Sequence, residues 1–350
     1  MNVAVFLPNW IGDAVMAGPA LRALRKHYGP DATLIGVMRP YVADVLAETN
    51  WLDCSCHYSP RSSSFELGSW NVLKRLRRQR LDAAILFSNS LRTAMLAFGA
   101  GAEERIGYAR HGRGPLLTKR LSPPRQEGTI IPTPTVDYYL ALAAAVGCPP
   151  ESPRLELATS KGDERAADIA WRKLGLDEDR PMVAFNCSGA YGAAKLWPVE
   201  HFAALARRVA DELSASILVL CGPSERKTAE AIVNQAKHRH VVSLANEPLG
   251  IGLSKACIRR SQLLVTTDSG PLHIAAAFDV PYIGLFGPTP PICVQNPTAR
   301  AVALQADIDC LGCQERTCPL GHHRCMKDLS VERVLRAVAT QMVQPRRQAA

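Results

Sequence analysis

The strongest constraint on the fold is an alternation of short apolar runs with amphipathic helical segments, which occurs twice along the 350 residues. Short apolar runs are typical of strands buried on both faces, and their alternation with helices predicts βαβ units with parallel sheets. Residues 99–134 are rich in glycine, proline and arginine, and we expect loops there. In the first half, the expected strands are 3–7, 33–38 and 83–88, and the expected helices are 13–28, 41–48, 72–80, 91–98 and 136–146.

A proline-rich stretch with one charged helix, residues 148–180, is the expected connection to the second half. A single core stops growing at roughly 250–300 residues, so this length favours two domains. We therefore predict an α/β chain of two tandem, doubly wound, Rossmann-like domains, 1–165 and 166–329, followed by a C-terminal helix and tail, 330–350. In the second half, the expected strands are 182–187, 216–221, 240–243, 263–267 and 281–286, and the expected helices are 199–213, 224–237, 249–256, 271–278 and 331–343.

Ligands of open α/β sheets bind outside the carboxyl ends of the strands, so two such domains facing each other would form a cleft with the active site. The first segment at such a position is PNWIGDAV, residues 8–15. Gly12 permits a close backbone turn, and Asp13 falls at or beside the start of the next helix. Two interpretations of Asp13 remain open: a helix cap, and a general base facing the cleft.

Two further segments carry anion-binding chemistry. A small-residue loop follows the strand at 182–187 and leads through Ser188 to Lys195, just before a helix. The segment TTDSGPLHIAA, residues 266–276, runs from a strand into a helix, with Asp268, Ser269, Gly270 and His273 around the helix start. Loop amides, the helix dipole and an ammonium group all favour a phosphate at such places. The alternatives are a solvated lysine and a purely capping role.

Composition excludes several classes of protein. The hydrophobic share of 47% and charged share of 21% are those of a folded chain, and no apolar run reaches the roughly 18–20 residues of a membrane span. No secretory signal is recognisable, so we expect a cytoplasmic protein. The net charge is +9, and residues 1–150 hold 17 Lys or Arg against 11 Asp or Glu. That surplus favours an anionic partner, but no nucleic-acid-binding signature is present.

Motifs for common cofactors are missing. Neither GxGxxG nor GxxxxGK[ST] occurs, which disfavours a dinucleotide enzyme and a P-loop NTPase, and we expect no cofactor. Acidic pairs with DxD spacing at Asp177–Asp179 and Asp307–Asp309 lie in polar connections, so we expect no metal clamp.

Four late cysteines form a separate cluster with C-x2-C-x4-C-x6-C spacing and two histidines between the last two. Zinc bound by thiolates is one interpretation. Reduced structural thiols and a redox-labile loop are the others, and the sequence leaves metal binding and disulfide formation open. The cluster consists of Cys310, Cys313, Cys318 and Cys325, with His322 and His323.

Taken together, these segments resemble the heptosyltransferases of glycosyltransferase family 9. The resemblance is carried by PNWIGDAVMAGPALRAL (8–24), KLWP (195–198), LCGPSE (220–225) and TTDSGPLHIAAA (266–277), and it runs through nearly the whole chain. The tail CLGCQERTCPLGHHRCM (310–326) is similar to the branch that adds the second inner-core heptose.

The resemblance implies the GT-B fold and an inverting, metal-independent glycosyltransferase. Such an enzyme would move heptose from ADP-heptose to the heptosyl-Kdo-lipid A inner core of lipopolysaccharide. The alternatives are a transferase of this family with another nucleotide sugar or acceptor, and a non-catalytic nucleotide-sugar-binding protein.

The resemblance also implies residue roles. Asp13 corresponds to the catalytic base, Lys195 to a lysine near the donor phosphates, and Glu225 to an acidic residue near the adenosine. Asp268 corresponds to the residue that contacts the donor sugar. The residues between Ser188 and Lys195 depart from the pattern, because they lack a hydroxyl pair that some relatives have there. The full expected donor set is Ser188, Lys195, Glu225, Asp268, Ser269, Gly270 and His273.

The basic residues of the first half have an expected partner as well. We expect them to face the anionic acceptor and the inner face of the cytoplasmic membrane, with the protein bound peripherally. The alternative is that they are ordinary solvated helix faces. The cations concerned are Arg22, Arg25, Lys74, Arg75, Arg77 and Arg78.

Overall fold

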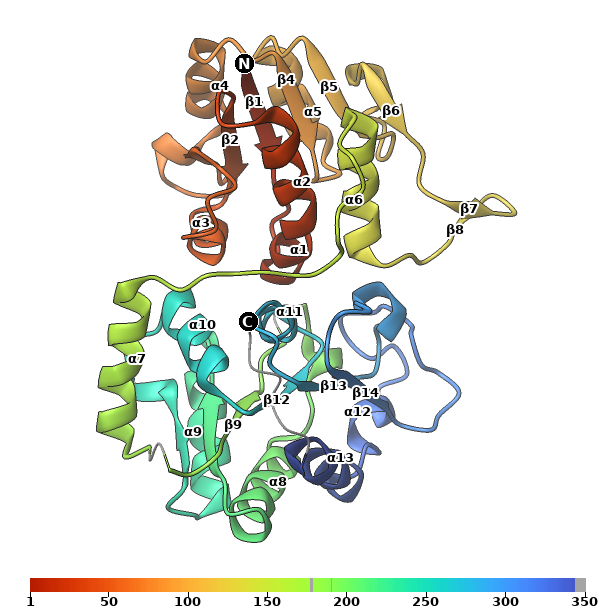
Figure 1. The fold of residues 1–350 in the computed structure, drawn as a ribbon. Coiled ribbons are helices and arrows are strands. Elements are labelled where there is room, and N and C mark those ends of the chain that lie inside the picture. Colours follow the sequence, from red (N-terminus) through yellow and green to blue (C-terminus); the bar gives the residue numbers. More distant parts are fainter. Residues whose placement is uncertain (177–178, 190, 344–350) are drawn as a thin grey trace. The chain divides into compact units, whose positions relative to one another are not determined.

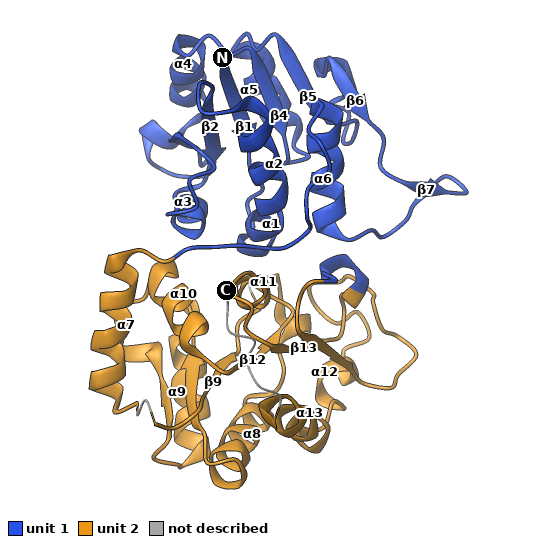
Figure 2. Ribbon diagram, in the orientation of Figure 1, with its two compact units in different colours: residues 1–158, 292–297 blue, residues 159–291, 298–350 orange. Residues whose placement is uncertain are grey.

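The computed structural model describes residues 1–176, 179–189 and 191–343 (Figure 1). The chain forms two compact units: residues 1–158 with 292–297, and residues 159–291 with 298–350 (Figure 2). Each unit contains a six-stranded parallel sheet with helices on both faces, so the predicted pair of doubly wound α/β units is confirmed. The tail 344–350 and the first two residues of the acidic triplet at 177–179 lie outside the described residues.

The sheet of the first unit has the strand order β3-β2-β1-β4-β5-β6. Val3 of the central strand pairs with Leu34 on one side and Ala83 on the other. The strand order reverses between β1 and β4, which makes that edge the place where a doubly wound sheet binds its ligand. The strands are β1 (Asn2–Phe6), β2 (Thr33–Met38), β3 (Cys54–His57), β4 (Ala83–Leu86), β5 (Glu104–Tyr108) and β6 (Lys119–Leu121).

The helix expected over 13–28 is two helices. Ala17 is both the C-cap of the first helix and the N-cap of the second. Pro19, near the start of the second helix, has no N–H and so cannot continue the backbone hydrogen bonds of the first. The helices of this unit are α1 (Ile11–Met16), α2 (Gly18–Tyr28), α3 (Pro40–Leu46), α4 (Ser69–Arg78), α5 (Leu91–Gly99) and α6 (Thr135–Val146).

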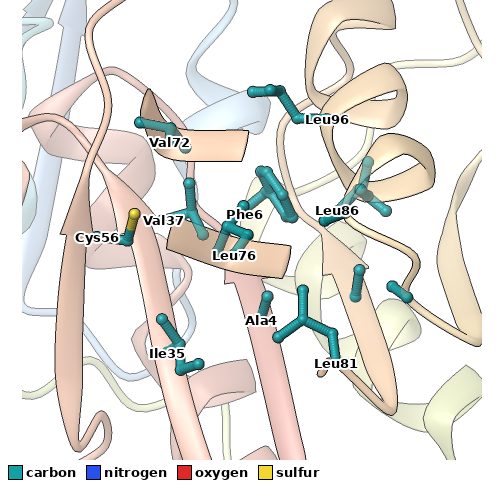
Figure 3. Close-up of a cluster of buried hydrophobic side chains, with 14 of the residues drawn as sticks. Ala4, Phe6, Ile35, Val37, Cys56, Val72, Leu76, Leu81, Leu86 and Leu96 are labelled. Atoms are coloured by element: carbon teal, nitrogen blue, oxygen red, sulfur yellow. The ribbon is translucent and has the colours of Figure 1, made fainter. Parts of the chain in front are cut away.

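One face of the first sheet packs against α4 and α5 (Figure 3). Phe6, Val37 and Leu86 project from three neighbouring strands and meet Val72 and Leu96 of the helices, all of them buried. Full burial of each large side chain contributes about 1.5–3 kcal/mol, so this layer fixes α4 and α5 firmly on the sheet.

The expectation of a loop-rich stretch over 99–134 is only partly right: most of these residues lie outside helices and strands, but the stretch also contains strands. The region contains β5, β6 and a short antiparallel hairpin, β7 (Arg125–Gln126) and β8 (Thr129–Ile130). Strands β3 and β14 (Ala301–Gln305) were not expected either. Strands β3, β6 and β14 lie at sheet edges, and their partly exposed, partly polar side chains lack the continuous apolar signal of a central strand.

The second unit repeats the same strand order as β11-β10-β9-β12-β13-β14. The capping box of Ser160 and Asp163 begins α7, with hydrogen bonds of 3.0 and 2.9 Å. The strands preceding β14 are β9 (Met182–Asn186), β10 (Ser216–Leu220), β11 (Val241–Ser243), β12 (Leu263–Thr267) and β13 (Tyr282–Phe286). The helices are α7 (Lys161–Leu174), α8 (Val199–Glu212), α9 (Arg226–Ala236), α10 (Ile251–Arg260), α11 (Gly270–Ala277), α12 (Arg324–Lys327) and α13 (Val331–Val343).

The final helix, α13, packs against α8 and the second sheet and therefore belongs to the second unit. Among the helices that the structure describes, none combines the length and the apolar character needed to cross a lipid bilayer. Short 3₁₀ turns occur in the loops: η1 (Phe65–Leu67), η2 (Gly114–Leu116), η3 (Ala193–Lys195), η4 (Pro223–Glu225), η5 (Leu244–Asn246) and η6 (Pro291–Val294).

Candidate active site

Asp13 lies just beyond the carboxyl end of the central strand β1, in the first turn of α1. The N-cap of this helix is Trp10, whose side chain makes no capping hydrogen bond. The preceding loop is held in place by two hydrogen bonds, from the Leu7 amide to the Val37 carbonyl at 3.0 Å and from the Tyr41 hydroxyl to the Asn9 carbonyl at 2.5 Å. A carboxylate in the first turn interacts favourably with the helix dipole, and the fixed loop keeps its position defined.

A pocket of about 290 Å³ within the first unit contains Asp13. Asn89 lines it from the loop after β4, the strand beside β1, so both residues lie where the strand order reverses. Cys293 lines it from the segment 292–297, and the Cys293 carbonyl accepts a hydrogen bond of 3.0 Å from the Thr135 hydroxyl. The other lining residues are Arg110, Pro123, Pro124, Ile130, Ile131, Pro132, Thr133, Thr135, Tyr138 and Tyr139.

The electrostatics of this pocket keep a neutral phenol beside the carboxylate. Tyr139 is buried, and burial raises the pKa of its hydroxyl well above the ordinary value. The negative charge of Asp13 raises the pKa of Tyr139 further. Tyr139 therefore stays protonated at neutral pH.

A buried arginine orders the wall of the pocket, and sequence analysis missed it. Arg113 donates from Nε to the Tyr108 carbonyl at 2.8 Å and from Nη2 to Asn89 Oδ1 at 3.0 Å, and it also bonds the Ser88 carbonyl. The Tyr138 hydroxyl donates to the same Asn89 oxygen at 3.0 Å. Burial lowers the pKa of Arg113 to about 10, which still leaves it charged at pH 7.

A sequence signal existed for Asn89 but not for Arg113. Asn89 directly follows an expected strand, and ligands of open α/β sheets bind at the carboxyl ends of the strands. Arg113 lies in a stretch expected to be loop, and its contacts with residues 5 to 25 positions away appear only in the fold.

In the second unit, the ends of β9 and β12 are hydrogen-bonded to each other. The side-chain amide of Asn186 donates from Nδ2 to the Thr266 hydroxyl at 2.9 Å and to the Ser269 hydroxyl at 2.8 Å. The Thr267 hydroxyl donates to the Ser188 carbonyl at 2.5 Å. These strands flank the reversal of strand order in the second sheet, so Ser188 and Ser269 are brought together at the equivalent place.

Lys195 and Asp268 form a buried ion pair in this place. The Lys195 ammonium lies 2.5 Å from Asp268 Oδ2, and the two side chains are 11% and 7% exposed. The ammonium also lies 4.7 Å from the centre of the Tyr191 ring, a cation–π distance. The sequence suggested two separate donor contacts, whereas the structure joins them into one charged unit.

His273 lies in α11, the helix that follows β12, and its side chain is buried. Burial lowers the pKa of its imidazole to about 4, although the neighbouring Asp268 carboxylate opposes the shift and Lys195 adds to it. The imidazole is therefore neutral at pH 7.

The remaining expected donor residues surround the same edge of the sheet. Ser269 is the N-cap of α11, and Gly270 is its first residue. The capping position thus belongs to Ser269, while Asp268 is engaged by Lys195. Glu225 follows β10, and its carboxylate accepts a 2.9 Å hydrogen bond from the Gly222 amide.

The six expected acceptor cations divide into two groups. Helix α4 covers one face of the first sheet, whereas α2 packs with α6 on the other, so the groups do not share one surface. Arg22 pairs with Glu151 at 3.3 Å and Glu156 at 2.9 Å, and Arg25 pairs with Asp53. On α4, Arg75 donates to the His57 carbonyl at 2.9 Å and Arg77 to the Gly99 carbonyl at 2.6 Å; Lys74 and Arg78 are exposed.

The cysteine-rich segment supports the loop that carries Lys195. The Tyr191 hydroxyl donates to the Gln314 carbonyl at 2.6 Å, and the Ala194 amide donates to the Arg316 carbonyl at 3.0 Å. His323 Nε2 lies 2.9 Å from the Ala194 carbonyl. All the cysteines are free thiols, and within 1–176, 179–189 and 191–343 no three His, Cys, Asp or Glu residues are arranged to hold a metal ion.

Comparison with known proteins identifies the family. The family described as "Glycosyltransferase family 9 (heptosyltransferase)" matches residues 69–324, well over half of the chain. This chain belongs to glycosyltransferase family 9. It is therefore a glycosyltransferase. Its two α/β units have the GT-B fold that the sequence resemblance implied.

Relatives of this family 9 glycosyltransferase match it along nearly its whole length. Lipopolysaccharide heptosyltransferase 2 of Escherichia coli (strain K12) is 27% identical over 98% of this chain and 99% of its own. The solved family 9 glycosyl transferase of Veillonella parvula superposes with a TM-score of 0.81 at 21% identity, covering 98% of this chain and 97% of that one. The E. coli ADP-heptose lps heptosyltransferase II structure gives a TM-score of 0.78 at 23% identity, covering 98% and 99%.

Proposed function

We propose that this family 9 glycosyltransferase moves heptose from ADP-heptose to the heptosyl-Kdo-lipid A inner core of lipopolysaccharide, with inversion at the anomeric carbon. The observation that carries the proposal is the full-length similarity to a protein named Lipopolysaccharide heptosyltransferase 2. Each unit also has ligand-capable residues at its reversal of strand order: Asp13 in the first, and Lys195 with Asp268 in the second.

The second unit supplies the donor chemistry in this proposal. Lys195 and the first amides of α11 bind the diphosphate, since ammonium groups and helix N-termini both favour anions. Asp268 keeps the lysine ammonium in place and accepts hydrogen bonds from the sugar. The leaving diphosphate gains negative charge in the transition state, so positive groups already in position lower the barrier. Ser188 contacts the phosphates, and Glu225 contacts the adenosine.

The first unit supplies the acceptor chemistry. Asp13 accepts the proton of the attacking heptose hydroxyl. The oxygen forms a bond to the anomeric carbon from the side opposite ADP, and the bond from that carbon to the β-phosphate oxygen breaks. ADP leaves with the electron pair, and the configuration at the carbon inverts. No step requires a cofactor or a metal ion, and no nucleic acid takes part.

The proposed acceptor is lipid-linked and anionic. We accordingly place the enzyme in the cytoplasm, bound peripherally to the inner face of the cytoplasmic membrane. The net charge of +9 favours that association.

The decisive test is incubation of the purified chain with ADP-heptose and a Kdo-lipid A acceptor that carries one heptose. Mass spectrometry should detect the acceptor with one additional heptose, and nuclear magnetic resonance should show the inverted linkage. Turnover with a UDP-sugar but not with ADP-heptose would contradict ADP-heptose as the donor. Release of free heptose without acceptor glycosylation would contradict the acceptor.

A further inference from the structure

A second hollow of the first unit is larger than the one around Asp13. This groove, of about 760 Å³, lies between α4 and α5. Its walls combine apolar side chains with two arginines and no acidic residue. The lining residues are Arg61, Ser69, Trp70, Leu73, Ser90, Leu91, Arg92, Met95 and Leu96.

Large apolar side chains are exposed around this groove. On α5, Leu91, Met95 and Phe98 are 43%, 58% and 57% exposed, and their spacing of four and then three residues places them on one face of the helix. Trp70 at the start of α4 is 68% exposed, and Phe65 in the preceding loop is 76% exposed. Exposed apolar side chains gathered on neighbouring elements in this way mark a surface that binds something.

The backbone around the patch is held in place. Asn71 donates from its side chain to the Phe65 carbonyl at 2.8 Å, and the Tyr58 and Ser69 hydroxyls lie 3.1 Å apart. Arg77 bonds the last residue of α5, Gly99, at 2.6 Å. The exposed side chains therefore project from an ordered surface.

The charge of the region complements an anionic surface. Residues 61–95 contain seven Lys or Arg and two acidic residues, Glu66 and Asp82. Asp82 accepts a hydrogen bond of 2.6 Å from the Asn2 amide at the amino end of the sheet. Arg61 and Arg92 line the groove itself, and the exposed cations of α4 are Lys74, Arg75, Arg77 and Arg78.

We propose that the groove between α4 and α5 docks on an anionic lipid bilayer. Trp70, Met95 and Phe98 enter the interface between headgroups and acyl chains, where aromatic and apolar residues are stable, while Arg61 and Arg92 bind lipid phosphates. The combination of tryptophan, exposed apolar residues and two arginines in a groove lined by no acidic residue fits a bilayer better than a protein partner.

The groove lies next to the pocket of Asp13, and if the proposed function holds, docking at the groove brings that pocket close to its acceptor. Ser90 lines the groove, and the adjacent Asn89 lines the pocket of Asp13. One loop after β4 therefore borders both. Docking at α4 and α5 would hold the acceptor pocket beside the membrane that contains a lipid-linked acceptor.

Flotation with vesicles tests the docking without any activity. The wild-type chain should float with vesicles of phosphatidylcholine and phosphatidylglycerol, and much less with pure phosphatidylcholine. The variant W70S/M95S should lose affinity roughly tenfold or more, since two exposed apolar anchors are removed. R61Q/R92Q should lose about fivefold for each charge removed. The matched controls I169S and R165Q/R207Q, at exposed positions of the second unit, should float like wild type.

Fluorescence gives a second, independent measurement. Trp70 is more exposed than Trp10, at 68% against 48%, and the three other tryptophans are buried. Anionic vesicles should shift the emission to shorter wavelength, and brominated lipids should quench it. In W70F most of the quenching should disappear while flotation persists, because phenylalanine still enters the interface.

Several results would overturn the proposal. Unchanged flotation of W70S/M95S would do so, as would wild-type fluorescence that brominated lipid fails to quench. Altered sedimentation of the groove variants without vesicles, with flotation unaffected, would indicate a contact between protein copies instead. Failure of the proposed function would look different: wild type would not transfer heptose to a deacylated acceptor free in solution, whereas vesicle binding would still be measurable.

Discussion

The ammonium of Lys195 lies 2.5 Å from Asp268 Oδ2, although 73 residues separate them in sequence. The pair joins the loop after β9 to the end of β12, where the second sheet reverses its strand order. Both side chains are nearly buried, so each charge is stable there mainly because the other is present. In the proposed function, donor binding and the stability of the second unit therefore depend on the same two residues.

Removing one member of that pair should destabilise the second unit. Replacing Asp268 by Asn, or Lys195 by Met, leaves an uncompensated buried charge, and we expect a loss of about 3 kcal/mol in the free energy of unfolding. The double variant K195M/D268N leaves no unpaired charge, so its free energy of unfolding should lie closer to that of wild type than those of the single variants. It should still bind ADP weakly. Urea denaturation and calorimetric titration with ADP measure the two effects separately. Additive losses in the double variant would contradict the coupling.

Asp13→Asn should lower the turnover of heptose transfer by about 10²–10⁴-fold, because the amide cannot accept the proton of the attacking hydroxyl. Donor affinity and the free energy of unfolding should change little. Asp31→Asn, at an exposed position before β2, is the matched control and should behave like wild type. Unchanged turnover of D13N at saturating donor would exclude Asp13 as the base.

Acid should destabilise the second unit through His273. The pKa of this imidazole is about 4 in the folded chain against an ordinary value of 6.5. Between these pH values only the unfolded state binds the proton, so the stability contributed by the neutral imidazole is complete above pH 6.5 and is lost as the pH falls toward 4. At 1.36 kcal/mol for each pKa unit, the loss approaches about 3 kcal/mol.

Urea denaturation of wild type and His273→Asn at a series of pH values isolates this contribution. The difference in unfolding free energy between the two proteins should narrow as the pH falls through that window. A difference that stays constant with pH would show that the histidine is not held neutral by the fold.

Arg113→Met should disturb the acceptor pocket from a distance. The substitution removes the hydrogen bonds that Arg113 donates to the Ser88 and Tyr108 carbonyls and to the Asn89 side-chain oxygen. Their loss costs about 1–3 kcal/mol of stability. Because Asn89 also lines the pocket of Asp13, we expect a higher KM for the acceptor with unchanged affinity for ADP. Arg120→Met, at an exposed position of β6, is the control. Equal effects on donor and acceptor would indicate general unfolding instead.

Gly192→Ala should separate the cysteine-rich segment from the loop of Lys195. A Cβ at Gly192 would lie 2.3 Å from the backbone carbonyl oxygen of Arg316, so one of the two chain segments must move. We expect a lower melting temperature and weaker ADP binding. Gly250→Ala is the matched control, since a Cβ there meets no atom within 4 Å. ADP affinity equal to wild type in G192A would show that the contact does not shape the loop.

The sequence was sufficient to predict the central strands and to place single candidate site residues at their carboxyl ends, for a local reason. A strand such as β1 or β12 is buried on both faces and reads as a continuous apolar run, and the residue after it marks the ligand edge. Asp13 and Asp268 were found in this way. The edge strands β3 and β14 carry partly exposed side chains and gave no such signal.

Pairings between distant residues were not predictable from the chain alone. The contact of Lys195 with Asp268, and that of Arg113 with Asn89, depend on which strands lie side by side, and no periodicity encodes this. The same holds for Arg22 and Arg25, which read as free cations in sequence but meet Glu151, Glu156 and Asp53 in the fold.

The contact between residues 314–323 and the loop at 191–195 has a consequence for synthesis of the chain. The loop emerges from the ribosome more than a hundred residues before the segment that braces it. Nascent chains that stop before residue 314 would contain every proposed donor residue yet lack that brace. The braced state of the second unit is thus reached only after residues 314–323 have been synthesised as well.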